Sequence, residues 1–410
     1  MEIARVSGPL RVAVLGAGTV GREVIRGFLE HPERLRPTDG SALTLVAVAV
    51  RDTARARARA DGIPPGLVGD APAHLVASPD TDIIVELMGG DEPAHTLVAA
   101  ALAAGKSVVT ANKHLIAHHG PALEAIARRT GASLRFEAAV GGGIPVLGPL
   151  ATDLAANRVT AVRGIVNGTT NFILTAMADE GRSYDDVLAA AQAAGYAEAD
   201  PSGDVEGLDA ANKLVLLVRL AFGSWIDPDG VPKRSLRADG TLGAPGITGV
   251  TAADIAAAAE QGWTIKLLAS AAGAARLAAA GPPTAAAAGA TPVASASSSP
   301  GAVRVTASVV PTAVPSDSPF GRTGGVLNRI EIDAEPIGRV AFSGPGAGGA
   351  ATSSAVLGDL LAIARELGST WAGLPPANRA ERDDDPSERR SAPGGPWFDA
   401  PSGARYPIVE

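Results

Sequence analysis

The sequence predicts an α/β protein, with a doubly wound parallel sheet in its first 140 residues and an α+β domain behind it. Two observations lead to this prediction. Up to about residue 140, short apolar runs alternate with helix-like segments, which is typical of a parallel sheet covered by helices on both faces. After about residue 150 the alternation stops, and amphipathic helices precede the next apolar runs.

Five apolar runs are expected to form the parallel sheet, and helices are expected between them. The predicted strands are 11–15 (RVAVL), 43–50 (LTLVAVAV), 82–87 (DIIVEL), 107–110 (SVVT) and 133–137 (SLRFE). The predicted helices are 19–29, 94–104 and 121–129.

The second half of the chain contains helix-start signals and two segments without a core pattern. Ser183 with Asp186, and Thr251 with Asp254, have the spacing of a capping box, the latter before an alanine-rich helix that carries Lys266. Further helices are expected at 205–222 and 353–367, and ordered structure is expected to return at 303–310 and 329–340. The alanine-, proline- and serine-rich run 271–300 is expected to be a flexible insertion, and residues 368–410 a disordered tail.

Composition excludes several classes of protein. The 410 residues include no cysteine, which rules out disulfides, zinc–thiolate sites and thiol nucleophiles. The net charge of −8 disfavours nucleic-acid binding, and no apolar stretch is long enough to span a membrane. The amino terminus has no secretory pattern, so we expect a cytoplasmic protein. Only five lysines stand against 30 arginines, at positions 106, 113, 213, 233 and 266.

A glycine-rich turn follows the first strand. Gly16, Gly18 and Gly21 form a GxGxxG pattern, and Thr19 and Val20 open the next helix. In this strand–turn–helix context the glycines allow a tight turn, close approach of a pyrophosphate and close helix packing, which predicts a Rossmann-type dinucleotide site. The alternative is a structural turn without a ligand.

The end of the second strand bears on which dinucleotide is bound. Arg51 there favours the 2′-phosphate of NADP, whereas the adjacent Asp52 keeps NAD possible. Arg55 and Arg57 follow closely. These arginines could instead form a solvated helix face.

Five motifs, taken together, resemble the homoserine dehydrogenase family. They are residues 111–113 (ANK), 137–145 (EAAVGGGIP), 167–171 (NGTTN), 195–213 (GYAEADPSGDVEGLDAANK) and 344–348 (GPGAG). They occur in the family's order, and the resemblance covers roughly residues 10–270 and 302–367.

The resemblance implies reversible, NAD(P)-dependent hydride transfer between L-homoserine and L-aspartate 4-semialdehyde, in threonine, methionine and isoleucine synthesis. It also implies an NAD(P)-binding domain of residues 1–148 and 340–367, and a catalytic and dimerisation domain of residues 149–339. A homodimer or homotetramer is expected. The regulatory ACT domain of many relatives is not recognised, so we predict no threonine feedback.

Asp209 and Lys213 are four residues apart, which places them on one face of a helix. An ordinary surface pair is the alternative, but the apolar run LVLLV that follows indicates a buried helix, and burial of an ion pair favours a functional role. A lysine ammonium can polarise a carbonyl and give it a proton. By resemblance Lys213 is this acid/base, Asp209 positions it, and Lys113 lies near both nicotinamide and substrate.

The resemblance also assigns binding roles to polar loop residues. Glu198 would pair with the substrate ammonium and Asp204 would be a further contact, although acidic residues in such loops are commonly solvated. Gly348 matches a cofactor-contacting position. His118 and His119 show no third ligand and are expected to be a solvated loop pair.

A monovalent cation loop is the last implied site. The carboxylate of Glu137 and the carbonyls of Val140, Gly142 and Ile144 would hold structural sodium. The alternative is a structural turn in which Glu137 pairs elsewhere.

Two rival functions stay open at this point. One is another NAD(P)-dependent amino-acid oxidoreductase, which would not share residues 195–213. The other is an inactive cofactor-binding relative with a regulatory role, which the presence of Lys113, Asp209 and Lys213 disfavours.

Overall fold

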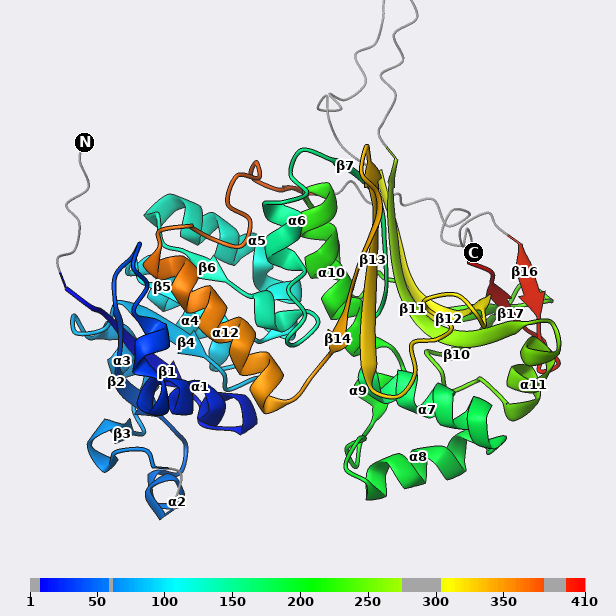
Figure 1. The fold of residues 1–410 in the computed structure, drawn as a ribbon, viewed down its shortest axis with the longest axis horizontal. Helices are drawn as coiled ribbons and strands as arrows, with labels where there is room; N and C mark the ends of the chain where they lie inside the picture. The colour runs from blue at the N-terminus through cyan, green and yellow to red at the C-terminus, as the bar shows by residue number, and fades with distance from the viewer. Residues whose placement is uncertain (1–7, 59–61, 275–303, 380–395, 410) are drawn as a thin grey trace, which may run out of the picture.

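The computed structural model describes residues 8–58, 62–274, 304–379 and 396–409. One part of the molecule is built on a parallel sheet and the other on an antiparallel sheet, and they lie side by side (Figure 1). The predicted α/β fold class is confirmed. Within the described ranges, none of the helices combines the length and apolar character that a membrane span requires.

The parallel sheet has six strands in the order β3-β2-β1-β4-β5-β6. Its strands are β1 (Leu10–Leu15), β2 (Leu43–Ala49), β3 (Val68–Gly69), β4 (Ile83–Glu86), β5 (Ser107–Thr110) and β6 (Leu134–Arg135). The order reverses between β1 and β4, where open α/β sheets bind ligands. The short β3 lies outside the predicted strands, because two residues after a proline-rich turn carry no apolar pattern.

Helices connect these strands. They are α1 (Thr19–Glu30), α2 (Thr53–Ala58), α3 (Pro72–Ala77), α4 (Ala94–Ala103) and α5 (Lys113–Thr130), with 3-10 turns at Pro32–Leu35, Pro65–Leu67 and Glu137–Ala139. The predicted start of α5 at Pro121 is wrong. Asn112 caps the helix earlier, by accepting the Leu115 N–H at 3.1 Å, and Pro121 lies inside it.

A helix from the far end of the chain completes this part. α12 (Gly349–Ala364) packs along α1 (Figure 1), and Val24 and Phe28 share one buried cluster with Val356 and Leu360. A Cβ on Gly27 would lie only 2.9 Å from Leu357 Cδ1, so α1 and α12 touch closely there.

The second part contains a five-stranded antiparallel sheet in the order β12-β11-β7-β13-β14. The strands are β7 (Arg158–Ile165), β11 (Trp263–Ala274), β12 (Arg304–Pro315), β13 (Leu327–Glu335) and β14 (Gly338–Pro345). The ordered segment expected at 329–340 belongs to the hairpin of β13 and β14.

The helix expected to carry Lys266 ends earlier. α11 (Ala252–Glu260) stops before Gly262, whose φ of +79° breaks the helix, and Lys266 lies on β11. The strand includes residues 271–274 of the expected insertion, and residues 275–300 of that insertion lie outside the described ones.

Five helices of the described chain lie between residues 147 and 222, and two of them contain parts of the motif at 195–213. They are α6 (Leu147–Ala151), α7 (Gly168–Glu180), α8 (Tyr184–Ala193), α9 (Ser202–Val205) and α10 (Leu208–Phe222). The helix predicted at 205–222 is divided, because Gly207 has a φ of +85°. Residues 213–220 are all buried, as the apolar run predicts.

Part of the expected disordered tail is folded, so that prediction is wrong for residues 396–409. β16 (Trp397–Asp399) and β17 (Ala404–Pro407) join β9 (Arg234–Arg237) and β10 (Leu242–Pro245) in one sheet, and β15 (Asn378–Arg379) pairs with β8 (Ser224–Trp225). Phe398 and Tyr406 are buried. The Tyr406 hydroxyl donates to the buried carboxylate of Asp254 at 3.1 Å, which explains why this segment docks.

Replacing Tyr406 with phenylalanine should destabilise the fold, because it leaves Asp254 one donor short. We expect a loss of about 1–2 kcal/mol in the free energy of unfolding, measured by urea denaturation. Tyr196, which is half exposed, is the matched control, and its phenylalanine variant should change stability by less than about 0.5 kcal/mol. Equal stability of the two variants would mean that the tail is not docked through Tyr406.

Candidate active site

In the glycine turn after β1, the backbone is tightly packed at Gly16 and Gly21 and open at Gly18. Gly16 has a φ of +106°, and a Cβ there would lie 2.6 Å from the Leu87 carbonyl oxygen. A Cβ on Gly21 would lie 2.0 Å from the Gly16 oxygen, whereas one on Gly18 meets nothing within 4 Å. Gly16 and Gly21 are therefore required by packing, and Gly18 leaves room for a ligand to approach the backbone.

Two helix N-termini meet at this turn. Gly18 begins α1 without a side-chain cap or an acidic residue in the first turn, so the N–H groups of Thr19 and Val20 suit a phosphate. A Cβ on Gly349 would lie 2.9 Å from the Thr19 oxygen, which places Gly348, the N-cap of α12, beside the same turn. These residues fit a bound dinucleotide.

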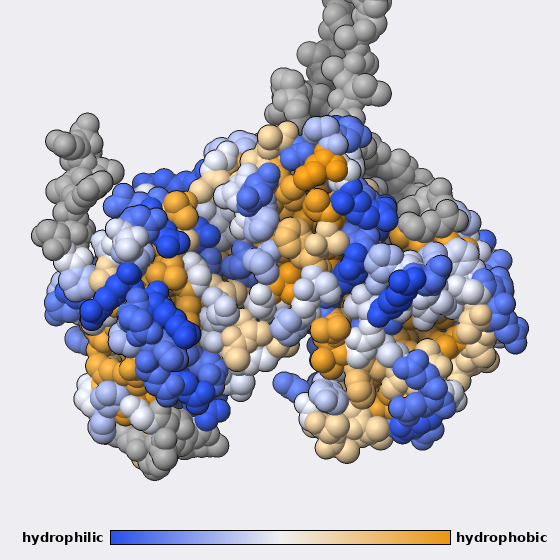
Figure 2. Space-filling view, in the orientation of Figure 1, coloured by the Kyte–Doolittle hydropathy of each residue, from blue (hydrophilic) through white to orange (hydrophobic). Residues whose placement is uncertain are grey.

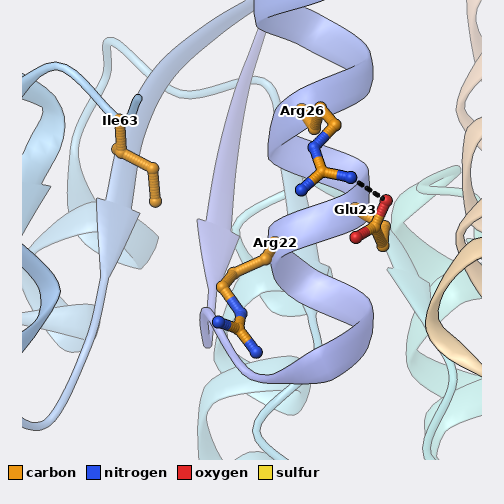
Figure 3. A pocket seen from close by; sticks show the side chains of 4 residues that line it. All are labelled: Arg22, Glu23, Arg26 and Ile63. Carbon is orange, nitrogen blue, oxygen red and sulfur yellow. Dashed lines mark hydrogen bonds and ion pairs between the residues drawn. The ribbon is translucent and has the colours of Figure 1, made fainter. Parts of the chain in front are cut away.

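The surroundings of the turn are cationic. Arg51 is exposed at the end of β2, while the side chains of Arg55 and Arg57 lie outside the described residues. A pocket of about 240 Å³ lies against α1, lined by Arg22, Glu23, Arg26 and Ile63 (Figure 3). In it Arg26 pairs with Glu23 at 3.0 Å, and Arg22 directly follows Gly21 of the turn. The sequence pattern gave no sign of this pocket.

Three charged side chains predicted for catalysis come together where the two parts meet. Asp209 lies at the start of α10 between two lysines, with Lys213 Nζ 2.7 Å from Oδ2 and Lys113 Nζ 3.0 Å from Oδ1. Lys213 also donates to the Val166 carbonyl oxygen at 2.7 Å. The surface is hollowed between the two parts, on the side where α9 and the start of α12 lie (Figures 1 and 2).

Burial differs between the two lysines. Lys213 is 8% exposed, whereas the side chain of Lys113 is 40% exposed. The carboxylate of Asp209 raises the pKa of Lys113, which burial alone would lower. For Asp209 itself burial opposes ionisation, but the charges of Lys213 and Lys113 outweigh it and hold the pKa of Asp209 well below its usual range.

Asn167 connects the acidic residues of the cluster; it belongs to the motif at 167–171, but no role was predicted for it from the sequence. Its Nδ2 donates to Asp209 at 2.9 Å and to Asp204 at 2.7 Å, while its Oδ1 accepts the Thr170 N–H and so caps α7. An asparagine directly before a helix is a capping signal, and that signal predicts the bond to Thr170 but neither of the other two.

The two predicted substrate residues precede α10 in the sequence. Asp204 is half-buried on α9, and Glu198 is exposed in the loop before it. Both carboxylates add to the raised pKa of Lys113, which means that they lie within electrostatic reach of its ammonium.

The carboxylate of Glu137 accepts three backbone N–H groups, and its predicted role as a cation ligand stays a prediction. Oε1 accepts the N–H groups of Val146 and Leu147 at 2.7 and 2.8 Å, and Oε2 accepts that of Gly148 at 2.6 Å. Burial raises the pKa of Glu137, and the neighbouring Asp359 adds to this. The side chain therefore anchors the start of α6. The cation-binding role of the carbonyls of Val140, Gly142 and Ile144 also stays a prediction.

The predicted loop position of His118 and His119 is also wrong, because α5 starts at Lys113 and includes both. His119 pairs with Asp91 at 2.7 Å and stacks on His95, while His118 lies against His114. In the described part of the chain, no three acidic or histidine side chains are arranged to hold a metal ion.

An open glycine turn in a Rossmann domain, together with a Lys–Asp–Lys cluster where the two parts meet, is typical of a dinucleotide-dependent oxidoreductase. Two family models match this chain: homoserine dehydrogenase over residues 145–361, and the NAD-binding domain of homoserine dehydrogenase over residues 16–137. The chain belongs to the homoserine dehydrogenase family, and it is an NAD(P)-dependent oxidoreductase.

Individual relatives agree with this assignment. Homoserine dehydrogenase of Corynebacterium glutamicum is 41% identical over 378 residues, covering 90% of this chain and 77% of the relative. That of Mycobacterium tuberculosis is 42% identical over 363 residues, covering 88% and 74%.

Solved structures show the same likeness. A homoserine dehydrogenase from Thiobacillus denitrificans has a TM-score of 0.77 at 35% identity, covering 91% of this chain and 78% of the other. A hyperthermophilic archaeal homoserine dehydrogenase in complex with NADPH has a TM-score of 0.64 at 27% identity, covering 86% and 97%.

Proposed function

We propose that this homoserine dehydrogenase uses Lys213 as its acid/base, in the reversible interconversion of L-aspartate 4-semialdehyde and L-homoserine. The observation that carries this role is the placement of Lys213. Its ammonium is buried, and within the described residues it donates two N–H groups, to Asp209 and to the Val166 carbonyl. A lysine ammonium has three, so the third can donate to a substrate oxygen.

The proton inventory of the reaction follows from this arrangement. When bound, the reduced nicotinamide supplies a hydride to the aldehyde carbon. The electron pair of the C=O π bond moves to oxygen, and Lys213 gives that oxygen a proton and becomes a neutral amine. Solvent then returns a proton to the amine. In the oxidative direction Lys213 removes the hydroxyl proton.

The acidic side chains are proposed to orient the reacting molecule. Homoserine carries an ammonium group, and Glu198 is proposed to pair with it, with Asp204 as a further contact. These roles are supported by electrostatics, because the carboxylates of Glu198 and Asp204 both raise the pKa of Lys113. Lys113, tied to the other oxygen of Asp209, is proposed to hold the cofactor and substrate next to Lys213.

NADP is the proposed cofactor, with NAD as the alternative. Arg51 supports this choice, because it is exposed at the end of β2, where the 2′-phosphate lies in this fold. The glycine turn and the Gly348 loop are proposed to hold the pyrophosphate.

Replacing Arg51 with alanine should weaken NADPH binding and spare NADH binding, because only NADPH carries the 2′-phosphate. We expect the KM for NADPH to rise about tenfold, which corresponds to the loss of one charge-assisted contact. Initial-rate measurements with both cofactors test this. Arg182, a partly exposed arginine just before α8, provides the control Arg182→Ala, which should leave both KM values unchanged. If the KM for NADH rises as much as that for NADPH, Arg51 does not select between the two cofactors.

The family's assembly is proposed here as a homodimer or homotetramer formed by the second part. Apolar side chains support this, since Val326, Leu327 and Ile337 are exposed beside β13 and β14. Figure 2 shows an apolar band over the same strands.

One assay tests the proposed activity directly. The purified protein is mixed with NADPH and aspartate semialdehyde, and the absorbance of the reduced nicotinamide is followed. We expect it to fall, with homoserine as the product. Binding of NADPH without turnover would instead support the inactive, regulatory alternative.

A further inference from the structure

A buried carboxylate lies at the end of β4, next to the point where the strand order reverses. Glu86 is 0% exposed. Among the described residues it forms no ion pair with a lysine, arginine or histidine. A buried carboxylate costs several kcal/mol unless hydrogen bonds replace its hydration. An apolar residue would suit this strand position better, since Ile83, Ile84 and Val85 precede it, so Glu86 needs an explanation.

Every partner of Glu86 donates to it. Oε1 accepts the N–H groups of Met88 and Gly89 at 2.8 and 3.1 Å. Oε2 accepts the hydroxyl of Thr110 at 2.6 Å. Thr110 Oγ1 also accepts the Asn112 N–H at 2.9 Å, so this hydroxyl connects the Glu86 carboxylate to the backbone of Asn112.

These bonds run from the sheet to Lys113. Thr110 is 0% exposed at the end of β5, and it holds the backbone of Asn112. Asn112 caps α5, whose first residue is Lys113, and its Nδ2 donates to the Gly90 carbonyl at 2.7 Å. Glu86 therefore fixes two segments at once: the loop of residues 88–90, which follows the Leu87 carbonyl packed on Gly16, and the start of α5.

We infer that Glu86 and Thr110 are positioning residues for the reaction, which act through Asn112 on Lys113. This inference rests on the proposed role of Lys113. A shift of a few tenths of an ångström at the start of α5 moves the Lys113 ammonium relative to Asp209, and reaction rates are steep in such displacements. A purely structural role for the same bonds would change stability and leave kcat intact.

The test compares Thr110→Val with Thr110→Ser, in the wild type and in Lys113→Ala. The valine variant keeps the shape and loses both hydrogen bonds, so we expect kcat to fall about tenfold. The serine variant keeps the hydroxyl and should recover most of that loss. When Thr110→Val is added to Lys113→Ala, kcat should fall by less than about twofold, because the ammonium that Thr110 positions is already absent.

Thr312→Val is the matched control, since Thr312 is also buried on a strand and loses one hydrogen bond, to the Val310 carbonyl. It should lower the melting temperature and leave kcat unchanged. Should Thr110→Val not fold, Glu86→Gln is measured in the same two backgrounds, with the same expected non-additivity.

Two results overturn the inference in distinguishable ways. If Thr110→Val lowers kcat equally in the wild type and in Lys113→Ala, the hydrogen bonds of Thr110 do not act through Lys113. The proposed role of Lys113 would then stand. If Lys113→Ala is as active as the wild type, the proposed role of Lys113 fails, and the inference fails with it.

Discussion

Replacing Lys213 with alanine is expected to lower kcat about a thousandfold. The variant loses both the proton donor and the cation that polarises the carbonyl, and each effect alone is commonly worth a hundredfold or more. The glycine turn and Gly348 are untouched, so the dissociation constant for NADPH should stay within about twofold. Stopped-flow turnover and fluorescence titration of NADPH measure the two quantities separately.

Two comparisons make this prediction specific. Lys213→Arg keeps the charge but cannot give up a proton near neutral pH, so it should be nearly as slow as the alanine variant. Lys106 lies at the opposite end of the parallel sheet and donates to the Ser78 carbonyl, so Lys106→Ala should keep kcat unchanged. An arginine variant with near-normal kcat would show that only charge is needed.

Replacing Asp209 with asparagine is expected to lower both activity and stability. The carboxylate bridges Lys213 and Lys113 and accepts from Asn167, so its loss leaves two ammonium groups facing a neutral amide. We expect kcat to fall about a hundredfold. Removing one partner from a buried ion pair commonly costs about 3 kcal/mol, which urea denaturation at neutral pH should show. Asp185→Asn, an exposed change on α8, should alter neither quantity.

The pH dependence of this variant has a definite sign. The pKa of Asp209 is lowered in the folded state, so its ionised form stabilises the protein above the unfolded pKa, and that contribution is lost as the pH falls through the folded pKa. The stability difference between wild type and Asp209→Asn should be largest near neutral pH and shrink below about pH 4. A difference that grows at acidic pH would contradict the ionised state assigned to Asp209.

The loss of Asp209 should also change the activity profile at alkaline pH. Asp209 raises the pKa of Lys113 in the wild type. Without it, Lys113 loses its proton at a lower pH, and the alkaline limb of kcat/KM should move to lower pH. If the alkaline limb of kcat/KM does not move, Lys113 is not the group whose deprotonation causes it.

The parallel sheet was predictable because its signals are local. Apolar runs, the glycine turn and the alternation with helices are all read within a few residues, and every strand of the sheet except the two-residue β3 follows them. The start of α5 was missed because a proline suggested a helix beginning, while the cap formed by Asn112 precedes it. The folded tail was missed because β16 and β17 are short, and their partners β9 and Asp254 are remote in the sequence.

The site shows the same division between local and remote information. Asp209 and Lys213 share a helix face, so their spacing alone predicts a contact. Lys113 joins them only through the meeting of the two parts, and the family resemblance, rather than any spacing, indicated it. The contacts of Glu137 with the start of α6 came from the structure, because the resemblance indicated only a cation-binding role for its carboxylate. Asn167 and Glu86 act through tertiary contacts that no sequence pattern specifies.

Chemical rescue of Lys213→Ala by small primary amines tests the central claim most directly. If Lys213 is the acid/base, methylamine or ethylamine should restore turnover in proportion to its concentration, and the rescued rate should vary with the pKa of the amine. Lys113→Ala serves as the comparison and should show no such dependence. The opposite result would contradict the assignment of Lys213 as the acid/base. In that case amines would rescue Lys113→Ala, while Lys213→Ala would bind NADPH normally and respond to no amine.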